Sequence, residues 1–309
     1  MTTPALPRRL RLGTRGSPLA LTQARMTIAA LQAAHGWSDD AVEIVAIKTS
    51  GDRIQDRALA DVGGKALWTK ELDRALIDGE IDFAVHSMKD VETIRPAEIV
   101  IAAMLPRADV RDRLIGAKSL AALPRSPRIG TSSPRRAAQV RRTRPDAEIV
   151  LFRGNVDTRL AKLASGEADA TLLASAGLDR LGRGDIGHAI PIEEMLPAPA
   201  QGAVGIETLA ARADMRALLG AIDHETTNAC VTAERALLAA LGADCRSPVA
   251  ALAIRSGAGL HLRAEILTED GREQRSGEAM LLGVDDVGTL AHKLLDGASP
   301  RLRALFTGA

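Results

Sequence analysis

The sequence predicts an α/β protein with mostly parallel sheets, followed by a smaller α+β unit that contains an antiparallel sheet. Short apolar runs typical of buried strands alternate with helical segments up to about residue 200, and such alternation is typical of βαβ units. Beyond that point one long helical segment precedes three strand-like runs, which favours antiparallel pairing. With 309 residues, 46% of them hydrophobic, the chain can form two or three domains with packed cores.

The first predicted unit starts with a short strand that leads into a capped helix. Ser17 is a good N-cap, Pro18 is a good first helical residue, and Gly36 is placed to end the helix. Free backbone N–H groups at that helix start, together with Arg15, suit an anion. The unit is expected to contain strands at 10–12, 42–48, 81–86 and 98–104, helices at 19–34 and 67–77, and a loop at 61–65.

A second unit begins near Asp109 and repeats the arrangement at Arg15. A strand leads into small polar residues, a helix start at Ser133 and Pro134, and two arginines. In such folds ligands bind beyond the C-terminal ends of the strands, where these polar clusters are expected. The predicted elements are strands at 128–130, 149–152 and 171–174, helices after the first two, a crossing segment at 196–202 and a returning strand at 203–207.

The third unit places a cysteine on a loop. Gly242 is suited to end the preceding helix and Pro248 to prevent a new one, so Cys245 is expected between elements. Arg246 beside it favours the thiolate, which is the nucleophilic form of cysteine. A loop cysteine without function is the alternative. The predicted elements are a helix at 226–241, strands at 249–254, 260–266 and 276–282, and a helix at 287–295.

Composition excludes several classes of protein. Two cysteines argue against a disulfide framework, and six scattered histidines without a CxxC pattern argue against a zinc site, so no metal is expected. The N-terminus has no signal-peptide core and no apolar run reaches membrane-spanning length, so a soluble cytoplasmic protein is expected. A net charge of +1, with 2% aromatic residues and no tyrosine, argues against a nucleic-acid partner.

Arginines at or just past predicted strand ends form the most informative pattern. For any one of them a solvated ion pair is the simpler explanation, but the set indicates a polyanion site, because arginine suits carboxylate and phosphate. Phosphate, nucleic acid and polycarboxylate all remain open at this step, and no Walker motif or GxGxxG is present. The set comprises Arg15, Arg135, Arg136, Arg153, Arg159 and Arg180.

Asp90 follows a buried-type strand and lies beside Ser87 and Lys89, which makes it a candidate general acid or base. A helix-capping aspartate is the alternative. Cys230 lies among apolar residues at helical spacing and is expected in the core.

A series of motifs gives this sequence a family resemblance over nearly its whole length. In order they are TRGSPLALTQA, VGGKALWTKELD, VHSMKDV, IGTSSPRRAAQ, FRGNVDTRL, AGLDRLG, PAPAQGAVGIE, VTAERALL and GADCRSP. The sequence resembles the hydroxymethylbilane synthase (porphobilinogen deaminase) family. The resemblance implies two lobes like those of periplasmic binding proteins, with mixed, mostly parallel sheets, and a smaller α+β domain with a three-stranded antiparallel sheet. The implied boundaries are 1–104 with 203–220, then 109–197, then 225–309.

The resemblance also implies an activity and a cofactor. Family members are transferases that join four porphobilinogen molecules head to tail, release ammonia at each addition and hydrolyse the product to hydroxymethylbilane, in tetrapyrrole (haem) biosynthesis. Their dipyrromethane cofactor is held by a thioether to the cysteine that matches Cys245. Asp90 matches the aspartate that protonates the departing amine, stabilises the resulting cation and manages the later deprotonation. A monomer is implied as well.

The remaining site residues also follow from the resemblance. The cofactor-binding set comprises Cys245, Ser87, Lys89, Asp90, Thr131, Ser132, Ser133, Arg135, Arg136, Arg153 and Gly154. The substrate-binding set comprises Arg15, Gln23, Lys65, Arg153, Arg159 and Arg180.

The sequence departs from the family pattern at Asp61, at Pro134, at Pro199-Ala200 and at Ala243-Asp244 before the cysteine. The departures at Asp61 and Asp244 concern fine substrate contacts and the geometry of the cofactor loop, and they leave the aspartate, the cysteine and the matched arginines unchanged. A non-catalytic two-lobed anion-binding protein is the alternative function, but it leaves Cys245 and the Asp90 motif without a purpose. An arginine-rich RNA-binding module is opposed by the charge and the scarcity of aromatic residues.

Overall fold

The computed structural model describes residues 8–49, 69–244, 247–282 and 285–306. The chain divides into two compact units. Among the described residues, unit 1 comprises 8–49, 69–108 and 203–228, and unit 2 comprises 109–202, 229–244, 247–282 and 285–306. The division into three domains stays a prediction. Among the described residues, no helix combines the length and apolar character that crossing a membrane requires.

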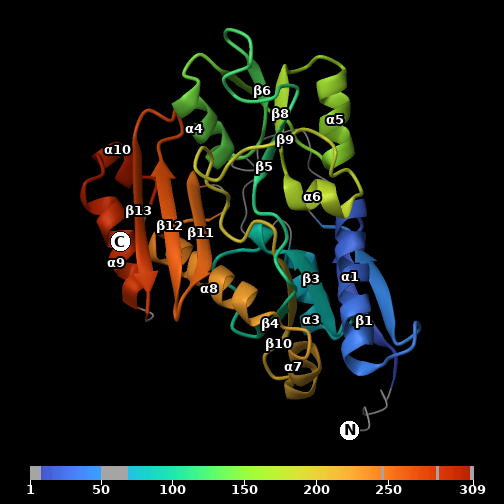
Figure 1. Ribbon diagram of the computed structural model, residues 1–309. Helices are drawn as coiled ribbons and strands as arrows, with labels where there is room; N and C mark the ends of the chain where they lie inside the picture. Colours follow the sequence, from blue (N-terminus) through green and yellow to red (C-terminus); the bar gives the residue numbers. More distant parts are fainter. Residues whose placement is uncertain (1–7, 50–68, 245–246, 283–284, 307–309) are drawn as a thin grey trace. The chain divides into compact units, whose positions relative to one another are not determined.

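Unit 1 is built on a five-stranded mixed sheet with the strand order β2-β1-β3-β10-β4. Parallel strands occupy one side, where β1 pairs with β2 and β3, whereas β10 is antiparallel to β3 and β4. Helix α1 packs on the parallel part (Figure 1). The elements are β1 (Leu10–Arg15), α1 (Pro18–His35), β2 (Val42–Ile47), α3 (Lys70–Ile77), β3 (Phe83–Ser87), the 3₁₀ helix η1 (Met88–Asp90), β4 (Ile99–Met104), β10 (Val204–Leu209) and α7 (Ala213–Gly220).

The start of α1 has the predicted cap. The Ser17 hydroxyl accepts a hydrogen bond from the Ala20 backbone N–H at 3.3 Å, Pro18 opens the helix, and Gly36 ends it in the left-handed region at φ 67°. Strand β1 continues three residues further than predicted, so Arg15 is its last residue. Arg15 and the helix start therefore lie at the C-terminal end of a parallel strand, as the sequence predicts.

Strand β10 depends on a glycine at its second position. Gly205 pairs with His86 of β3, and a Cβ atom built on Gly205 would lie 2.0 Å from the Sδ atom of Met88. Met88 is buried, and its backbone N–H donates to the Ala203 carbonyl at 3.1 Å. The absence of a side chain at Gly205 thus makes room for Met88, the first residue of the turn that carries Asp90.

Unit 2 contains two sheets, the first of which is again mixed. Its strand order is β7-β6-β8-β5-β9, with β6 parallel to β7 and β8, and β5 antiparallel to β8 and β9. The elements are β5 (Asp112–Ile115), β6 (Arg128–Gly130), α4 (Pro134–Thr143), β7 (Glu148–Val150), α5 (Val156–Ala164), β8 (Ala170–Ala174), α6 (Ser175–Arg180) and β9 (His188–Ala189).

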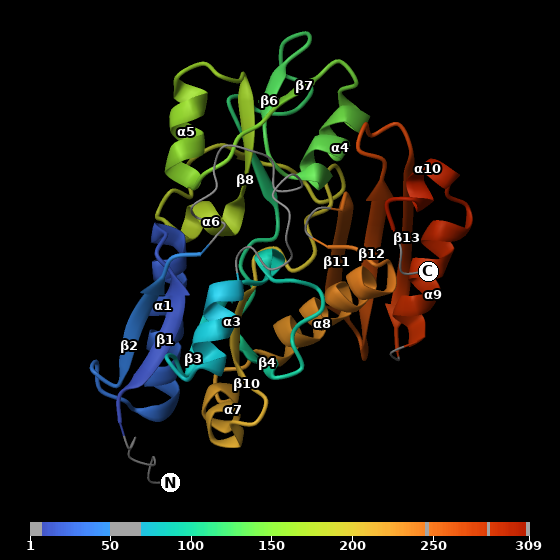
Figure 2. The same ribbon diagram turned by 180° about the vertical axis from the view of Figure 1, so that it is seen from behind.

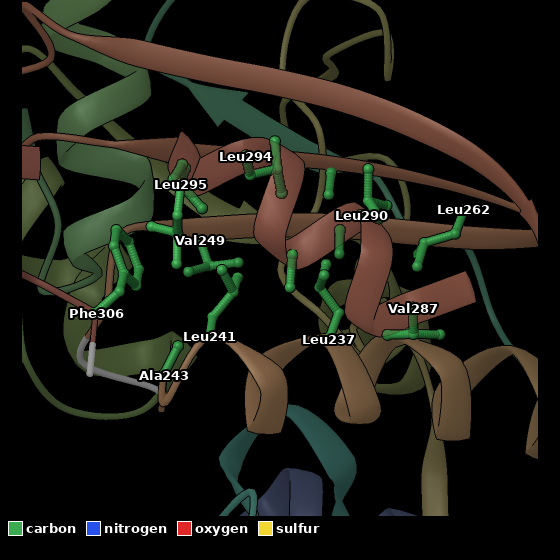
Figure 3. Close-up of a cluster of buried hydrophobic side chains, with 14 of the residues drawn as sticks. Leu237, Leu241, Ala243, Val249, Leu262, Val287, Leu290, Leu294, Leu295 and Phe306 are labelled. Carbon is green, nitrogen blue, oxygen red and sulfur yellow. The ribbon is translucent and has the colours of Figure 1, made fainter. Parts of the chain in front are cut away.

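The second sheet of unit 2 is a three-stranded antiparallel meander, as predicted. Figure 2 shows α8 and α9 beside its strands. Leu237 of α8, Leu241 just after that helix and Leu290 of α9 meet the sheet residues Val249 and Leu262 in one buried cluster (Figure 3). The elements are α8 (Glu225–Ala240), β11 (Val249–Ser256), β12 (Gly259–Leu267), β13 (Gln274–Leu281), α9 (Asp285–Asp296) and α10 (Pro300–Arg303).

The predicted fold class is therefore confirmed: mixed α/β sheets with a small three-stranded antiparallel sheet near the C-terminus. The sheets are less parallel than predicted, because β10 and β5 each run antiparallel to both neighbours. Five short elements, β5, β9, α6, α7 and α10, were not predicted.

Replacing Gly205 with alanine is expected to lower the free energy of unfolding by about 1–3 kcal/mol, because the new methyl group must displace the buried Met88. Gly220→Ala is the matched control, since no atom lies within 4 Å of a Cβ built there. Urea denaturation of the three proteins checks this. Equal stability of Gly205→Ala and Gly220→Ala would show that Met88 moves without cost.

Candidate active site

A pocket in unit 1 collects several of the residues that the sequence nominated. It lies at the ends of β1 and β3 and at the start of α1, with a cavity volume of ≈ 50 Å³. Arg15, Gln23, Ser87 and Asp90 all line it. The full lining consists of Arg15, Ser17, Leu19, Ala20, Gln23, Thr69, Val85, His86, Ser87, Asp90 and Val91.

Gln23 and Ser87 connect the helix to the strand across this pocket. The Gln23 Nε2 donates to the Ser87 hydroxyl at 2.7 Å, and that hydroxyl lies 3.2 Å from Gln23 Oε1. The Gln23 side chain is buried on α1, whereas Ser87 is the last residue of β3. The pair therefore fixes Ser87 at the strand end, one turn before Asp90.

Asp90 is the last residue of the 3₁₀ turn that follows β3. The Val91 N–H donates to the Met88 carbonyl at 3.2 Å, which closes the turn. No helix follows Asp90 before β4 begins at Ile99, so Asp90 is not a helix-capping aspartate. Its carboxyl group is half-buried at the edge of the pocket, which suits a group that exchanges protons with a ligand.

A buried network of charges lies behind the pocket and links four segments of unit 1. Glu207 of β10 is fully buried and accepts two hydrogen bonds from Arg95, Nε to Oε1 at 2.9 Å and a terminal nitrogen to Oε2 at 2.8 Å. The other terminal nitrogen of Arg95 donates to Glu92 at 2.8 Å and to Asp73 at 3.1 Å. The pocket residue Thr69 joins this network through a 2.6 Å hydrogen bond to Glu92.

These contacts determine the ionisation of the buried carboxylate. Burial opposes the charge on Glu207, but its contact with His86 and its pairing with Arg95 lower its pKa to about 2. Burial likewise acts to lower the pKa of Arg95, but Asp73 and Glu207 raise it above its usual value. Both groups are therefore charged at neutral pH.

In unit 2, Arg135 and Arg136 share one buried carboxylate. Asp112, the first residue of β5, accepts from Arg135 at 2.8 Å and from Arg136 at 2.7 Å. The amide of Gln201 donates to the same carboxylate at 2.9 Å. Burial opposes ionisation of Asp112, but the two guanidinium charges hold its pKa well below the usual range. Arg135 also donates to the Leu196 carbonyl at 3.0 Å.

This arrangement encloses both guanidinium groups among partners that belong to unit 2. Both side chains are buried, at 3% and 5% exposure, and most of their donors are satisfied inside the unit. Their Nε atoms, and that of Arg180, are buried without a hydrogen-bond partner among the described residues. A buried donor without a partner is costly, so each of these three N–H groups requires a partner that the described residues do not supply.

A second polar group of unit 2 surrounds the start of α5. Arg159 donates to the Gly154 carbonyl at 3.0 Å and to the Ser132 hydroxyl at 3.3 Å. Gly154 adopts φ 102°, where a side chain would be strained. The Ser133 N–H donates to the Thr131 hydroxyl at 3.1 Å, and Ser133 caps α4 as predicted.

The nominated residues are divided between the two units. Arg15, Gln23, Ser87 and Asp90 share the unit 1 pocket, with Lys89 in the same turn. Thr131, Ser132, Ser133, Arg135, Arg136, Arg153, Gly154, Arg159 and Arg180 belong to unit 2. Cys245 and Lys65 lie outside the described residues, as do Asp61 and Arg246. Cys230 is buried in the core, as predicted.

Sequence reasoning missed several charged and polar residues around these groups. His86, Thr69, Arg95, Glu207 and Asp112 had not been nominated. A usable signal existed for Glu207, because a carboxylate within an apolar strand pattern requires a buried partner. Within the described residues, no group of three or more His, Cys, Asp or Glu side chains is arranged to hold a metal ion.

Together, the fold and the pocket define an α/β protein with a candidate acid–base carboxyl group in a pocket that also contains Arg15, Gln23 and Ser87. Sequence comparison then identifies the family. The profile described as "Porphobilinogen deaminase, dipyromethane cofactor binding domain" matches residues 10–217, and "Porphobilinogen deaminase, C-terminal domain" matches residues 228–296. The chain belongs to the porphobilinogen deaminase family.

Individual relatives agree with this assignment. The porphobilinogen deaminase of Sphingopyxis alaskensis is 59% identical over 312 residues, covering 99% of this chain and 98% of the relative. That of Paracoccus denitrificans is 49% identical over 296 residues, covering 94% and 95%. Among solved structures, the VFT2 domain of Bordetella pertussis BvgS matches with 15% identity and a TM-score of 0.42, covering 74% of this chain and 89% of that domain.

The buried carboxylate generates a prediction about acid stability. The pKa of Glu207 falls from 4.5 to about 2 on folding, so its charge stabilises the protein at pH values above 4.5 and this contribution is lost as the pH falls toward 2. Glu207→Gln is therefore expected to lower the free energy of unfolding by about 3 kcal/mol at pH 7, and this deficit should shrink as the pH falls from 4.5 to 2. Urea denaturation across this range measures the deficit.

The matched control is Glu43→Gln, which changes an exposed glutamate on β2 of the same sheet. It should leave the free energy of unfolding close to that of the parent at every pH. A deficit of Glu207→Gln that stays constant down to pH 2 would contradict the account of the ionised, paired carboxylate.

Proposed function

We propose that this protein is a hydroxymethylbilane synthase, a transferase that joins porphobilinogen units head to tail with release of ammonia and then hydrolyses the chain to hydroxymethylbilane. The observation that carries the proposal is the unit 1 pocket, which sets Asp90 beside Arg15, Gln23 and Ser87. Each substrate unit has two carboxylates and an aminomethyl group. The pocket offers a cation for a carboxylate and an acid for the amine.

The chain's residues fit the dipyrromethane cofactor that the matched domain description names. The buried Nε donors of Arg135, Arg136 and Arg180 lack partners among the described residues, and the carboxylates of such a group would satisfy them. We assign cofactor binding to these arginines with Arg153, Gly154, Thr131, Ser132 and Ser133, and, from unit 1, to Ser87, Lys89 and Asp90. The attachment point is Cys245, through a thioether. When bound, the cofactor supplies the pyrrole carbon to which the first substrate unit is joined.

The remaining steps follow from this chain's own groups. Arg15 binds a substrate carboxylate by a charge-assisted contact, with Gln23, Lys65, Arg153, Arg159 and Arg180 assigned to other polar contacts. Asp90 gives its proton to the departing amine, and the carboxylate that remains stabilises the positive charge left on the substrate carbon. We also propose that the protein works as a cytoplasmic monomer.

A change at Asp90 tests the acid directly. Asp90→Asn keeps the size of the side chain but cannot donate the proton, so kcat should fall by about 10²–10⁴. Asp90→Glu keeps the acid and displaces it by one methylene, so it should be slow rather than inactive. Ammonia release from porphobilinogen measures both variants. Asp78→Asn, at an exposed residue outside the pocket, is the control and should match the parent. Normal elongation by Asp90→Asn would exclude Asp90 as the acid.

The attachment of the cofactor makes a separate prediction about the two cysteines. The intact protein should weigh more than its chain by two pyrrole units, and the added mass should map to the peptide that contains Cys245. Cys245→Ser should abolish both the adduct and activity. Cys230→Ser should keep the adduct, because Cys230 is buried in a hydrophobic cluster and affects only packing. Intact and peptide mass spectrometry decide this, and an active protein with an unmodified Cys245 would refute it.

A further inference from the structure

The pocket contains a histidine that the proposed reaction does not yet use. His86 is the fourth residue of β3, is 6% exposed and lines the pocket together with Asp90. Strand register explains its neighbour: His86 pairs with Gly205, so Glu207, two residues further along β10, projects from the same face. His86 Nε2 lies 3.1 Å from Glu207 Oε2.

Glu207 is held as a carboxylate in one orientation. Arg95 donates to both of its oxygens, and Arg95 is itself held by Asp73, Glu92 and Thr69. A fully buried carboxylate can only accept hydrogen bonds. If Nε2 were unprotonated, its lone pair would face a lone pair of Glu207 Oε2 at 3.1 Å, which is repulsive. Nε2 therefore carries the proton, although the ring is turned away from a linear hydrogen bond.

This arrangement fixes the tautomer of the neutral imidazole. With the proton on Nε2, the other ring nitrogen, Nδ1, is the one that can accept a proton. Nδ1 forms no hydrogen bond with a described residue. It is also not one of the fully buried polar atoms that lack a partner, so it is not sealed off from the pocket. General acid–base catalysis uses histidines of this kind. A carboxylate holds one ring nitrogen, here Nε2, and the other ring nitrogen, here Nδ1, exchanges the proton.

We propose that His86 is a second proton-handling residue of this site and that Glu207, anchored by Arg95, is the positioning residue that orients it. The proposal rests on the proposed function. Joining two pyrrole units forms one carbon–carbon bond, breaks a carbon–nitrogen bond and releases one proton from the attacked pyrrole carbon. Asp90 has by then given its proton to the departing ammonia and is a carboxylate.

The released proton passes to His86 Nδ1, and the imidazolium is balanced by Glu207 while it exists. His86 then returns the proton to Asp90, which restores the acid for the next substrate unit. No electrons are transferred overall, and one ammonia leaves for each carbon–carbon bond formed. His86 thus gives the site a place to hold the proton between elimination and the next addition.

Two isosteric substitutions separate this role from a structural one. His86→Gln places an amide donor near the position of Nε2, so it keeps the partner of Glu207 but cannot carry a proton. His86→Asn places its amide near the position of Nδ1 and leaves Glu207 without that partner. In the holoenzyme, His86→Gln should unfold at nearly the parent temperature, bind porphobilinogen with nearly the parent KM, and lose about tenfold or more in kcat. His86→Asn should lose kcat and also unfold at a lower temperature.

Nitrogen-15 NMR of the histidine side chains gives a readout that is independent of activity. The His86 signals, assigned by their loss in His86→Gln, should show the Nε2–H tautomer in the parent holoenzyme. A parent-like kcat in His86→Gln would reduce His86 to a structural partner of Glu207 and overturn the proposal, and so would an Nδ1–H tautomer. A parent that releases no ammonia would defeat the proposed function instead, while the tautomer would still decide whether Glu207 orients His86.

Discussion

The buried charge of Glu207 is the constraint on which unit 1 depends. A carboxylate with no exposed surface costs several kcal/mol unless it is paired, and here the partners are Arg95 and His86. Glu207 lies on β10, which reaches this sheet from a distant part of the sequence and pairs between β3 and β4. A slip of one residue in this pairing would turn Glu207 to the opposite face of the sheet. The ion pairs therefore specify the register.

That register also determines where the candidate acid lies. With Glu207 beside His86, Gly205 falls where Met88 is buried, and the turn that ends in Asp90 follows directly. Strand β10 therefore positions both the histidine, through Glu207, and the turn, through Gly205. Sheet pairing, charge pairing and the position of the reactive carboxyl group are parts of one arrangement, and a change to any of them should affect the others.

Unit 2 also buries charged side chains, but there the neighbouring charges are positive. Two neighbouring arginines would repel each other in a buried site, and Asp112 holds both while Gln201 and backbone carbonyls take further donors. The Nε atoms of Arg135 and Arg136 are buried without a partner among the described residues. Their orientation is set by the fixed partners of the other donors.

Local signals in the sequence predicted the helices with Ser-Pro starts, the main strands, and Arg15 and Asp90 as candidate site residues at strand ends, whereas Gln23 was nominated only by the family resemblance. They did not predict β5 or β9, because a four-residue strand with two charged residues and a two-residue strand carry no clear alternation. The pairing of Arg95 with Glu207 joins residues 112 positions apart, and no local pattern encodes such a contact. The assignments of Cys245 and Lys65 remain predictions from the family resemblance, since both lie outside the described residues.

The central claim is that this chain builds hydroxymethylbilane by repeated elimination of ammonia at one site. The most direct measurement is the ratio of ammonia released to hydroxymethylbilane formed, combined with the intact mass of the protein during a short exposure to limiting porphobilinogen. The account predicts four ammonia molecules per product and a ladder of protein masses separated by one pyrrole unit. Binding of porphobilinogen without ammonia release, or ammonia release without the mass ladder, would contradict it.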